Sequence, residues 1–349
     1  MANVSVIGSG SWGTALAILL SDNGHKVKMW STTKEKVENL RKEKVHPSLP
    51  NVILPDSLEY SDDLEYTMNG AELLVLAVPS IYTRQVASKM REFYKPNQVI
   101  VNVAKGIEES TLKILSVQIE EEIPNSIVTV LSGPSHAEEV SRRLPTTCVV
   151  GAHSKEKAAY VQNIFMNPVF RVYTSPDMLG IELGGSLKNV IALAAGITDG
   201  LGYGDNTKAA IITRGIAEMS RLGIKMGASY YSFAGLSGIG DLIVTCASRH
   251  SRNRKAGFLI AQGMSMQEAI KEVKMVVEGV YSAKAAKGLA VKYGVSMPIV
   301  EEVNLVLFEG KSPKVAVDDL MQRQKITESL SLDWESIPIE KSLRMTTQH

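Results

Sequence analysis

The sequence reads VIGSGSWGTALAILL over residues 6–20, and this stretch is the strongest single indication of the fold. It carries the spacing Gly8-x-Gly10-x-x-Gly13 directly after an apolar strand pattern and at the start of a helical pattern. Glycine at these positions permits a tight turn, a close approach of backbone to a pyrophosphate, and close packing of helix on strand. A glycine-rich turn without a ligand has the same composition. The strand–turn–helix context, however, is the one that a dinucleotide-binding turn requires, and the start of the helix favours phosphate.

Short apolar runs rich in Val, Ile and Leu repeat through the first half of the chain. They are continuously apolar rather than alternating, which is typical of strands buried on both faces of a parallel sheet. Helical patterns at 34–44, 80–93 and 110–121 separate several of them, so we expect right-handed crossovers and a doubly wound sheet. The runs are 3–8, 26–30, 72–78, 98–104 and 126–132, and 146–152 and 169–174 are candidates to extend the sheet.

The pattern changes near residue 180, where long helical patterns replace the strands. A Ser175-Pro176 turn signal precedes the change. We therefore predict an α/β, doubly wound Rossmann domain at 1–178, an all-α domain at 179–325 and a polar tail at 326–349. The helical patterns lie at 186–198, 207–226, 255–262, 265–273, 279–293 and 298–309.

The composition is that of an ordinary globular protein. Of 349 residues, 44% are apolar and 21% are charged, and the formal net charge is +1. Neither nucleic acid nor an anionic membrane is therefore expected as a partner. Cys148 and Cys246 are too few for a disulfide framework, which favours a reducing compartment. The start, MANVSVIGSG, lacks the cationic segment of a secretory signal, and no apolar run approaches the roughly 20 residues of a membrane-spanning helix, so we expect a cytosolic protein.

The end of the second predicted strand bears on which nucleotide binds. NAD-binding domains usually place Asp or Glu about 20 residues after the glycines, where the carboxylate holds the ribose 2′-hydroxyl. This chain has Trp30-Ser31-Thr32-Thr33-Lys34 there, and the first acid is Glu35. Hydroxyls with a nearby lysine can accommodate a 2′-phosphate, so we expect NADP, or the use of both nucleotides. The same residues would also serve as the N-cap of the 34–44 helix. Ser11 and Trp12 would lie beside the phosphates, although Trp12 is equally suited to packing.

Loops at the carboxyl ends of the strands are where an open α/β sheet binds its ligands. Lys105 follows one strand pattern and puts a cation at the mouth of the expected cleft. Gly133 and Ser135 follow the next pattern and offer a backbone N–H and a hydroxyl near a helix start. His136 is a candidate acid–base group, although an isolated histidine more often has a structural role.

Lys188 stands inside the stretch IELGGSLKNVIALAAG, residues 181–196, which is apolar or small almost all the way round the expected helix. A lysine is costly to bury unless it has a partner or a catalytic task, and burial lowers its pKa. Asp241 begins a later helical run and has Thr245 one turn on, on the same face, which makes Asp241 the candidate partner. A purely structural ion pair would give the same pattern.

A basic cluster precedes another helical pattern. Arginine side chains beside a helix start can form a phosphate or carboxylate site, although a solvated basic loop is the alternative. Glu278 stands before a further helix and is either a capping acid or a ribose contact. Cys246 lies in the middle of a helical run with no activating neighbour, so we interpret it as structural. The cluster consists of Arg249, Ser251, Arg252, Asn253 and Arg254.

Several of these segments together resemble one family. The blocks are VIGSGSWGTALA, AKGIE, LSGPSHAEEV, SLKNVIALAAGI, GLSGIGDLIVTCAS and SRNRKAG, and they occur in the family's order. Between residue 3 and about residue 325 the chain is similar to the soluble, cytosolic bacterial NAD(P)-dependent glycerol-3-phosphate dehydrogenases. The resemblance implies an all-helical second domain like that of 6-phosphogluconate dehydrogenase. It also implies interconversion of dihydroxyacetone phosphate and sn-glycerol 3-phosphate, supply of phospholipid synthesis, and a homodimer.

The same resemblance implies roles for individual residues. Lys188 would be the proton donor or acceptor, with Asp241 orienting it, and no metal would be needed. Many relatives carry a basic or imidazole side chain at the position of Thr32, so the chain departs from the pattern there. The substrate would be held by Lys105, Gly133, Ser135, Lys188, Asp241, Ser251, Arg252 and Asn253. The nucleotide would be held by Gly8, Gly10, Ser11, Trp12, Gly13, Thr32, Lys105, Ala137, Arg252, Val276 and Glu278.

Two other hypotheses fit part of the same pattern. A dehydrogenase with an all-helical second domain could act on a hydroxy acid or a sugar acid, in which case the substrate would carry a carboxylate in place of the phosphate. A non-catalytic sensor would bind NADPH without oxidising it, but it would have no use for the combination of Lys188, Asp241 and Arg252.

Overall fold

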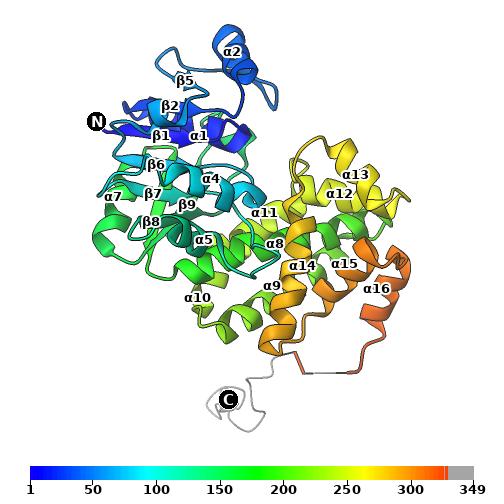
Figure 1. The fold of residues 1–349 in the computed structure, drawn as a ribbon. Coiled ribbons are helices and arrows are strands. Elements are labelled where there is room, and N and C mark those ends of the chain that lie inside the picture. Colours follow the sequence, from blue (N-terminus) through cyan, green and yellow to red (C-terminus); the bar gives the residue numbers. More distant parts are fainter. Residues whose placement is uncertain (326, 329–349) are drawn as a thin grey trace, which may run out of the picture.

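A computed structural model describes residues 1–325, 327 and 328, so the predicted polar tail lies outside the described residues apart from two positions. The first half forms an eight-stranded sheet in the order β10-β9-β8-β7-β6-β1-β2-β5 (Figure 1). After the last strand, the described chain is helical. The predicted fold class, a Rossmann domain followed by an all-helical domain, is confirmed.

All neighbouring strands in the sheet are parallel except β8 and β9, which are antiparallel. Both candidate runs, 146–152 and 169–174, therefore extend the sheet, but with the chain direction reversed. The sequence patterns missed the edge strand β5, which is short and polar. They also missed the hairpin of β3 (Val45–His46) and β4 (Leu49–Ile53), whose strands are short and include Pro50. The sheet consists of β1 (Asn3–Ile7), β2 (Lys26–Trp30), β5 (Glu59–Ser61), β6 (Leu73–Leu76), β7 (Val99–Asn102), β8 (Ile127–Ser132), β9 (Thr146–Ala152) and β10 (Phe170–Ser175).

Helices cover both faces of this sheet. The predicted 80–93 helix is instead a 3-10 turn followed by α4. The predicted 110–121 helix begins only at Leu115, because Leu112 has a left-handed backbone (φ 60°) and Ile107 pairs with Ile114 across the loop. The elements are α1 (Ser11–Asp22), α2 (Lys34–Glu43), α3 (Leu64–Met68), η1 (Ser80–Tyr82), α4 (Thr83–Met90), α5 (Leu115–Glu122), α6 (Ala137–Val140) and α7 (Lys155–Phe165).

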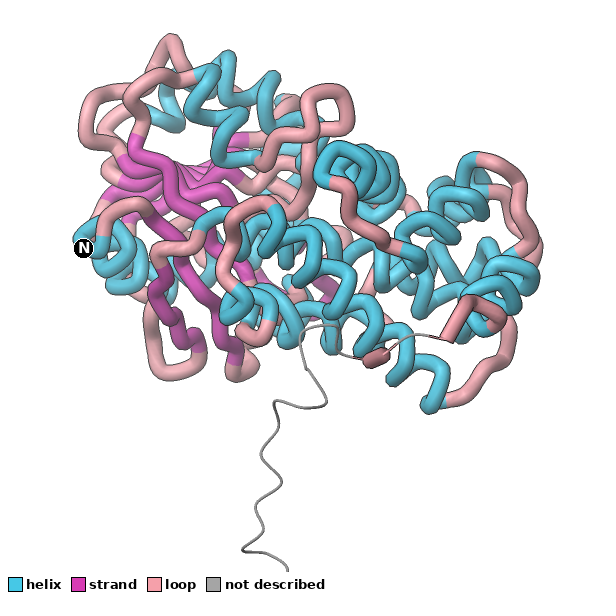
Figure 2. Tube along the Cα trace, turned by 90° about the horizontal axis from the view of Figure 1, so that it is seen from below, coloured by secondary structure: helices cyan, strands magenta, loops and turns pink. Residues whose placement is uncertain are grey.

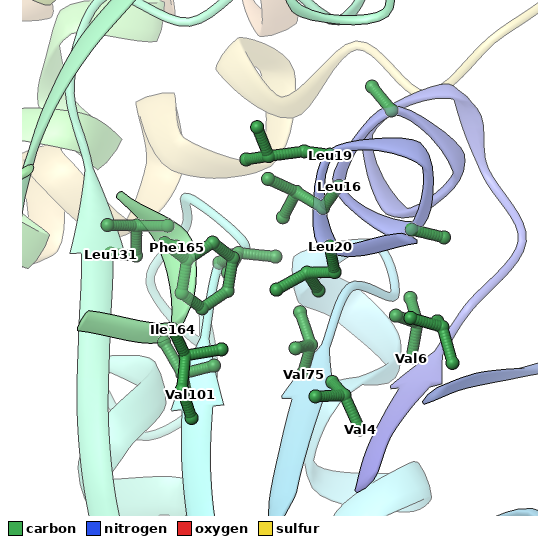
Figure 3. Close-up of a cluster of buried hydrophobic side chains, with 14 of the residues drawn as sticks. Val4, Val6, Leu16, Leu19, Leu20, Val75, Val101, Leu131, Ile164 and Phe165 are labelled. Carbon is green, nitrogen blue, oxygen red and sulfur yellow. The ribbon is translucent and has the colours of Figure 1, made fainter. Parts of the chain in front are cut away.

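Apolar cores lie on both faces of the sheet, because successive residues of a strand point to opposite sides. On one face, strand residues such as Val6 and Val75 pack under Leu16 and Leu20 of α1 and Phe165 of α7 (Figure 3). On the other face, the alternate residues of β1, β6 and β7 pack with Met90 and Ile119. Burial on both faces explains why the strand patterns are continuously apolar.

The helical part lies to one side of the sheet (Figure 2). It faces the carboxyl ends of the strands, because residues that follow β1, β6 and β7 line the same cavity as residues of α8, α11 and α12. Its central helix α8 begins at Met178, three residues after β10 ends. The elements are α8 (Met178–Gly200), α9 (Asp205–Lys225), α10 (Tyr230–Phe233), the π-helical turn η2 (Leu236–Gly240), α11 (Asp241–Ala247), α12 (Arg252–Ala261), α13 (Met266–Val273), α14 (Glu278–Tyr293), α15 (Pro298–Phe308) and α16 (Pro313–Met321).

Helix α8 is longer than the predicted 186–198 segment. Its 23 residues, with a mean hydropathy of 1.3 over 18 of them, make it long and apolar enough to cross a membrane, contrary to the expectation that no such run exists. However, 94% of that apolar segment is buried inside the protein. It is the one such helix in the described part of the chain, and its hydrophobicity is that of a core helix.

Candidate active site

A cavity of about 880 Å³ lies between the carboxyl ends of the strands and the helical part. The glycine turn, one face of α2 and the loops after β6, β7 and β8 line it from the sheet side. Residues of α8, α11 and α12 and the start of α14 line it from the other side. Nearly all the predicted site residues face this one cavity. Among the residues to which the family resemblance assigns roles, the exceptions are Gly13 and Gly133, which do not line it.

The glycine turn has the shape that a dinucleotide needs. A Cβ atom at position 8 would lie 2.7 Å from the Ala77 carbonyl oxygen, and one at position 13 would collide with the Gly8 carbonyl. At Gly10, which lines the cavity, a Cβ atom would meet no described atom within 4 Å. Gly10 is also the N-cap of α1, and it has no side chain that could accept from the first N–H groups of the helix. The open space and the uncapped helix start fit a pyrophosphate.

Alanine substitutions should separate these two roles. Gly13→Ala is expected to lower the free energy of unfolding by at least roughly 2 kcal/mol, because the added methyl group collides with backbone. Gly10→Ala is expected to leave that free energy within about 1 kcal/mol but to weaken nucleotide binding, because the methyl group enters the cavity. Denaturant unfolding and nucleotide titration of both variants provide the measurements. Equal stability of the two variants would contradict this division.

The remaining residues near the turn have mixed roles. Trp12 lines the cavity, but its indole N–H donates to the Val103 carbonyl at 3.2 Å, so it also packs against the loop after β7. Thr32 lines the cavity. Thr33 does not, and its hydroxyl caps α2 by accepting from Lys36 N–H. The N-cap alternative is therefore correct for Thr33 and not for Thr32.

Three charged side chains that line the cavity contact one another. The Asp241 carboxylate accepts from the Lys105 ammonium at 2.6 Å through one oxygen and lies 3.0 Å from the Lys188 ammonium through the other. Lys188 also donates to the Thr245 hydroxyl at 2.7 Å. Lys105 donates further to the Gly133 carbonyl at 2.9 Å. Lys188 and Asp241 are both almost completely buried.

The charges in this cluster determine each other's protonation. Burial lowers the pKa of Lys188 to about 8. The Asp241 charge opposes this shift, and the Lys105 charge adds to it. Burial alone would raise the pKa of Asp241, but the Lys105 and Lys188 ammonium groups hold it below its usual value. The cavity therefore holds a carboxylate at neutral pH beside an amine that can gain or lose a proton near pH 8.

Small residues bring the three side chains together. Gly184 and Gly185 lie one turn before Lys188 on α8. A Cβ atom at Gly184 would lie 2.7 Å from the Ser237 carbonyl, and one at Gly185 would lie 2.8 Å from the Ser132 hydroxyl and 3.4 Å from Lys105 Cγ. Any larger residue would push away either the segment before Asp241 or the strand-end loop with Lys105.

The basic cluster divides between the cavity and the interior. Arg252 is exposed and lines the cavity. Asn253 donates to the Asn189 amide oxygen at 2.9 Å, and Ser251 caps α12. Arg254 does not face the cavity, which corrects its prediction as a site residue. It binds Asp199 at 2.6 Å, and Lys208 binds the same carboxylate at 2.9 Å.

Comparison with known proteins identifies the family. Residues 3–158 match the model of the NAD-dependent glycerol-3-phosphate dehydrogenase N-terminus, and residues 177–318 match the model of its C-terminus. The chain belongs to the NAD-dependent glycerol-3-phosphate dehydrogenase family. It is 62% identical over 336 residues to glycerol-3-phosphate dehydrogenase [NAD(P)+] of Agathobacter rectalis, covering 96% of this chain and all of that one. Identity to the Fusobacterium nucleatum enzyme of the same name is 59%, covering 93% and 98%. The crystal structure of glycerol-3-phosphate dehydrogenase from Coxiella burnetii superimposes with a TM-score of 0.89 at 35% identity, covering 92% and 99%.

The remaining predicted site residues differ in whether they line the cavity or support its walls. Glu278 accepts from the backbone N–H of Ser80 at 3.0 Å and from its hydroxyl, so it joins α14 to the loop after β6. Arg249 is exposed and does not line the cavity. Gly133 has a backbone (φ 145°) that favours glycine, and it contributes its carbonyl to Lys105 and Ser135. Ser11, Ser135, Ala137 and Val276 line the cavity.

His136 and the cysteines carry no charge at neutral pH. Burial lowers the pKa of His136 to about 4 and raises the pKa values of Cys148 and Cys246 to about 12. His136 lines the cavity, with its ring 6.0 Å from that of His250. In the described part of the chain, no group of three His, Cys, Asp or Glu residues is arranged to hold a metal ion.

Some cavity residues had no role in the sequence analysis. Thr245 had been noted only as a neighbour of Asp241, and its contact with Lys188 depends on how α8 and α11 pack. Asn189 follows Lys188 directly and binds Asn253. One face of α2 and the hairpin residue His46 also line the cavity. The sequence spacing places four of these α2 residues on one helical face, but it does not show that this face lies near the glycine turn. The four are Lys36, Asn39, Leu40 and Glu43.

Proposed function

We propose that this protein interconverts dihydroxyacetone phosphate and sn-glycerol 3-phosphate with NADH or NADPH. The observation that carries the proposal is the placement of Lys188, Asp241 and Lys105 in the same cavity as the glycine turn. Membership of the glycerol-3-phosphate dehydrogenase family supports it. The substrate and nucleotide residues given above are part of this proposal.

The chain's own groups suit the proton side of the reaction. Bound NADH or NADPH supplies the hydride that reduces the C2 ketone. As negative charge develops on the ketone oxygen, the Lys188 ammonium stabilises it and donates a proton. In the oxidation of glycerol 3-phosphate, the neutral amine accepts that proton. Asp241 and Thr245 hold the amine in place, and Lys105 keeps the Asp241 charge balanced when Lys188 becomes neutral.

The phosphate end of the substrate would be held by the start of α12. Arg252 is exposed to the cavity there, and α12 is ten residues long, so its N-terminus carries partial positive charge. Binding energy from the phosphate would be used to position the ketone beside Lys188. Ser251 and Asn253 shape this end through the helix cap and the bond to Asn189.

The direction of the pH dependence follows from Lys188. Ketone reduction needs the ammonium form, so its rate should be high below pH 8 and fall as the pH rises through about 8. Oxidation of glycerol 3-phosphate needs the neutral amine and should rise over the same range. Initial rates in both directions, measured across this range, test the assignment. Parallel pH profiles in the two directions would contradict it.

Oxidation of NADPH and NADH with different ketones tests the substrate. We expect rapid nucleotide oxidation with dihydroxyacetone phosphate, and rates at least about 100-fold lower with dihydroxyacetone, which lacks the phosphate. The rival hypothesis of a hydroxy-acid dehydrogenase predicts faster oxidation with 2-oxo acids than with dihydroxyacetone phosphate. That outcome would overturn the proposed function.

The domain division, the oligomeric state, the cellular location and the metabolic role are part of the same proposal. The segment 1–178 would form the nucleotide domain and 179–325 the domain that supplies Lys188 and Arg252. We expect a cytoplasmic homodimer that provides glycerol 3-phosphate for phospholipid synthesis. Support comes from the family and from the burial of the apolar helix α8 inside the protein.

A further inference from the structure

One face of α2 forms the wall of the cavity beyond the glycine turn. Lys36, Asn39, Leu40 and Glu43 line the cavity, and their spacing puts them on one side of the helix. This wall follows β2, the second strand of the β1–α1–β2 unit. In such a unit the adenosine ribose lies at the carboxyl end of the second strand. The α2 wall is therefore next to the position of the ribose 2′ group.

The residues at the end of β2 leave that position without a carboxylate. Ser31 is buried, and its hydroxyl accepts from Ser9 at 2.7 Å. Thr32 lines the cavity and is uncharged, and Glu35 is not part of the lining. Glu43 lines the cavity, but it lies seven residues beyond Lys36, about 10 Å along the helix axis. The usual carboxylate that holds a 2′-hydroxyl and repels a 2′-phosphate is thus missing from this end of the wall.

Lys36 is the cation that remains available there. In the described part of the chain, Lys36 forms no ion pair, whereas Lys34 lies 3.9 Å from Glu38 and is not part of the lining. Arg41, further along α2, donates to the Tyr60 carbonyl and does not line the cavity. Five lysines and arginines line the cavity, and only Lys36 comes from α2, the helix that follows the β1–α1–β2 unit. The other four are Lys105, Lys188, Arg252 and Lys274.

The remaining cations are placed for other tasks. Lys105 and Lys188 are held by Asp241. Arg252 and Lys274 come from the helical part, on the opposite wall, where Arg252 donates to the Val276 carbonyl at 3.4 Å. Lys36 is exposed to the cavity and can meet a phosphate as a mobile point charge.

We infer that Lys36 recognises the 2′-phosphate of NADP(H) and makes the protein bind NADPH in preference to NADH. The inference rests on the proposed function for the identity of the cavity as a nucleotide site. A phosphomonoester carries close to two negative charges at neutral pH. NADH has only a hydroxyl at this position, so its affinity does not depend on Lys36.

Nucleotide titration of the ketone-free protein tests this inference. The wild-type protein should bind NADPH at least about tenfold more tightly than NADH. Binding is measured by the fluorescence of the reduced nucleotide. Lys36→Ala should raise the Kd of NADPH about tenfold and change the Kd of NADH less than about twofold. In a competition experiment against NADH, Lys36→Ala should weaken the binding of adenosine 2′,5′-bisphosphate about tenfold and that of AMP less than about twofold. Neither competitor contains a nicotinamide.

Two matched variants serve as controls. Lys34→Ala removes a lysine of the same helix that does not line the cavity. Lys274→Ala removes a cavity lysine on the opposite wall. Both should retain the wild-type ratio of NADPH to NADH affinity. The inference is overturned if the wild-type protein has no preference for NADPH, if Lys36→Ala retains it, or if a control variant loses it to the same extent.

These outcomes are distinct from a failure of the proposed function. Because the titration contains no ketone, it reports on Lys36 even if dihydroxyacetone phosphate is not turned over. Conversely, a protein that reduces dihydroxyacetone phosphate but binds NADPH and NADH equally tightly would retain its proposed function and refute the role of Lys36.

Discussion

Lys188→Met is expected to lower kcat for the reduction of dihydroxyacetone phosphate by about 10³–10⁴-fold while changing nucleotide affinity less than about twofold. The variant removes both the proton donor and the positive charge that stabilises the developing alkoxide. Methionine is similar in length to the apolar stem of lysine, so the packing of α8 is largely retained. Asp241 keeps Lys105 as a partner at 2.6 Å, which avoids an isolated buried carboxylate. Stopped-flow single turnovers and nucleotide titration provide the two readouts.

Lys208→Met is the matched control for this prediction. Lys208 is also a lysine of the helical part that is paired with an aspartate, Asp199, at 2.9 Å, but it does not line the cavity. We expect kcat to stay within about threefold of the wild-type value, because Arg254 continues to neutralise Asp199. Substantial turnover by Lys188→Met would show that another group supplies the proton.

Asp241→Asn is expected to have the second largest effect. An amide cannot neutralise the Lys105 and Lys188 ammonium groups, which then repel each other in a buried site. The Asp241 carboxylate raises the pKa of Lys188 against the effect of burial. Its loss should therefore move the fall in ketone reduction to lower pH. At pH 8 we expect kcat to drop about 10²–10³-fold, with a smaller deficit in more acidic solution.

The pH profile separates this role from a general loss of structure. Asp199→Asn serves as the control, because Asp199 also joins two cations, Lys208 and Arg254, away from the cavity. That variant should lose stability but retain the wild-type pH profile. If Asp241→Asn lowers activity equally at every pH, then Asp241 does not set the protonation of Lys188.

Much of the fold could be predicted because its signals are local. The glycine spacing, the continuously apolar strands and the change to helical patterns near residue 180 each depend on neighbouring residues. The direction of β9 could not be predicted, since an apolar run is compatible with either orientation. The strands of the β3–β4 hairpin are short and include Pro50. The hairpin is positioned by contacts such as that between His46 and the Ser9 carbonyl, 37 residues apart in sequence.

The residues of the candidate site could likewise be predicted where the signal was local, but their long-range contacts could not. Lys188 stood out because a charge inside an apolar helix needs an explanation, and Asp241 stood out because it begins a helix after glycines. That Asp241 also holds Lys105, 136 residues away, became apparent only from the fold. Arg254 belonged to a basic run in sequence, but its partner Asp199 is 55 residues away and draws it from the cavity. Long-range pairing decides which members of a local cluster share a site.

Phosphorus NMR of the wild-type protein with dihydroxyacetone phosphate and excess NADPH or NADH tests the central claim most directly. We expect the dihydroxyacetone phosphate signal to be replaced by that of glycerol 3-phosphate, with one nucleotide oxidised for each product molecule. Enzymatic assay of the product should identify it as the sn-3 isomer. An unchanged dihydroxyacetone phosphate signal, with both nucleotides bound to the folded protein, would contradict the claim.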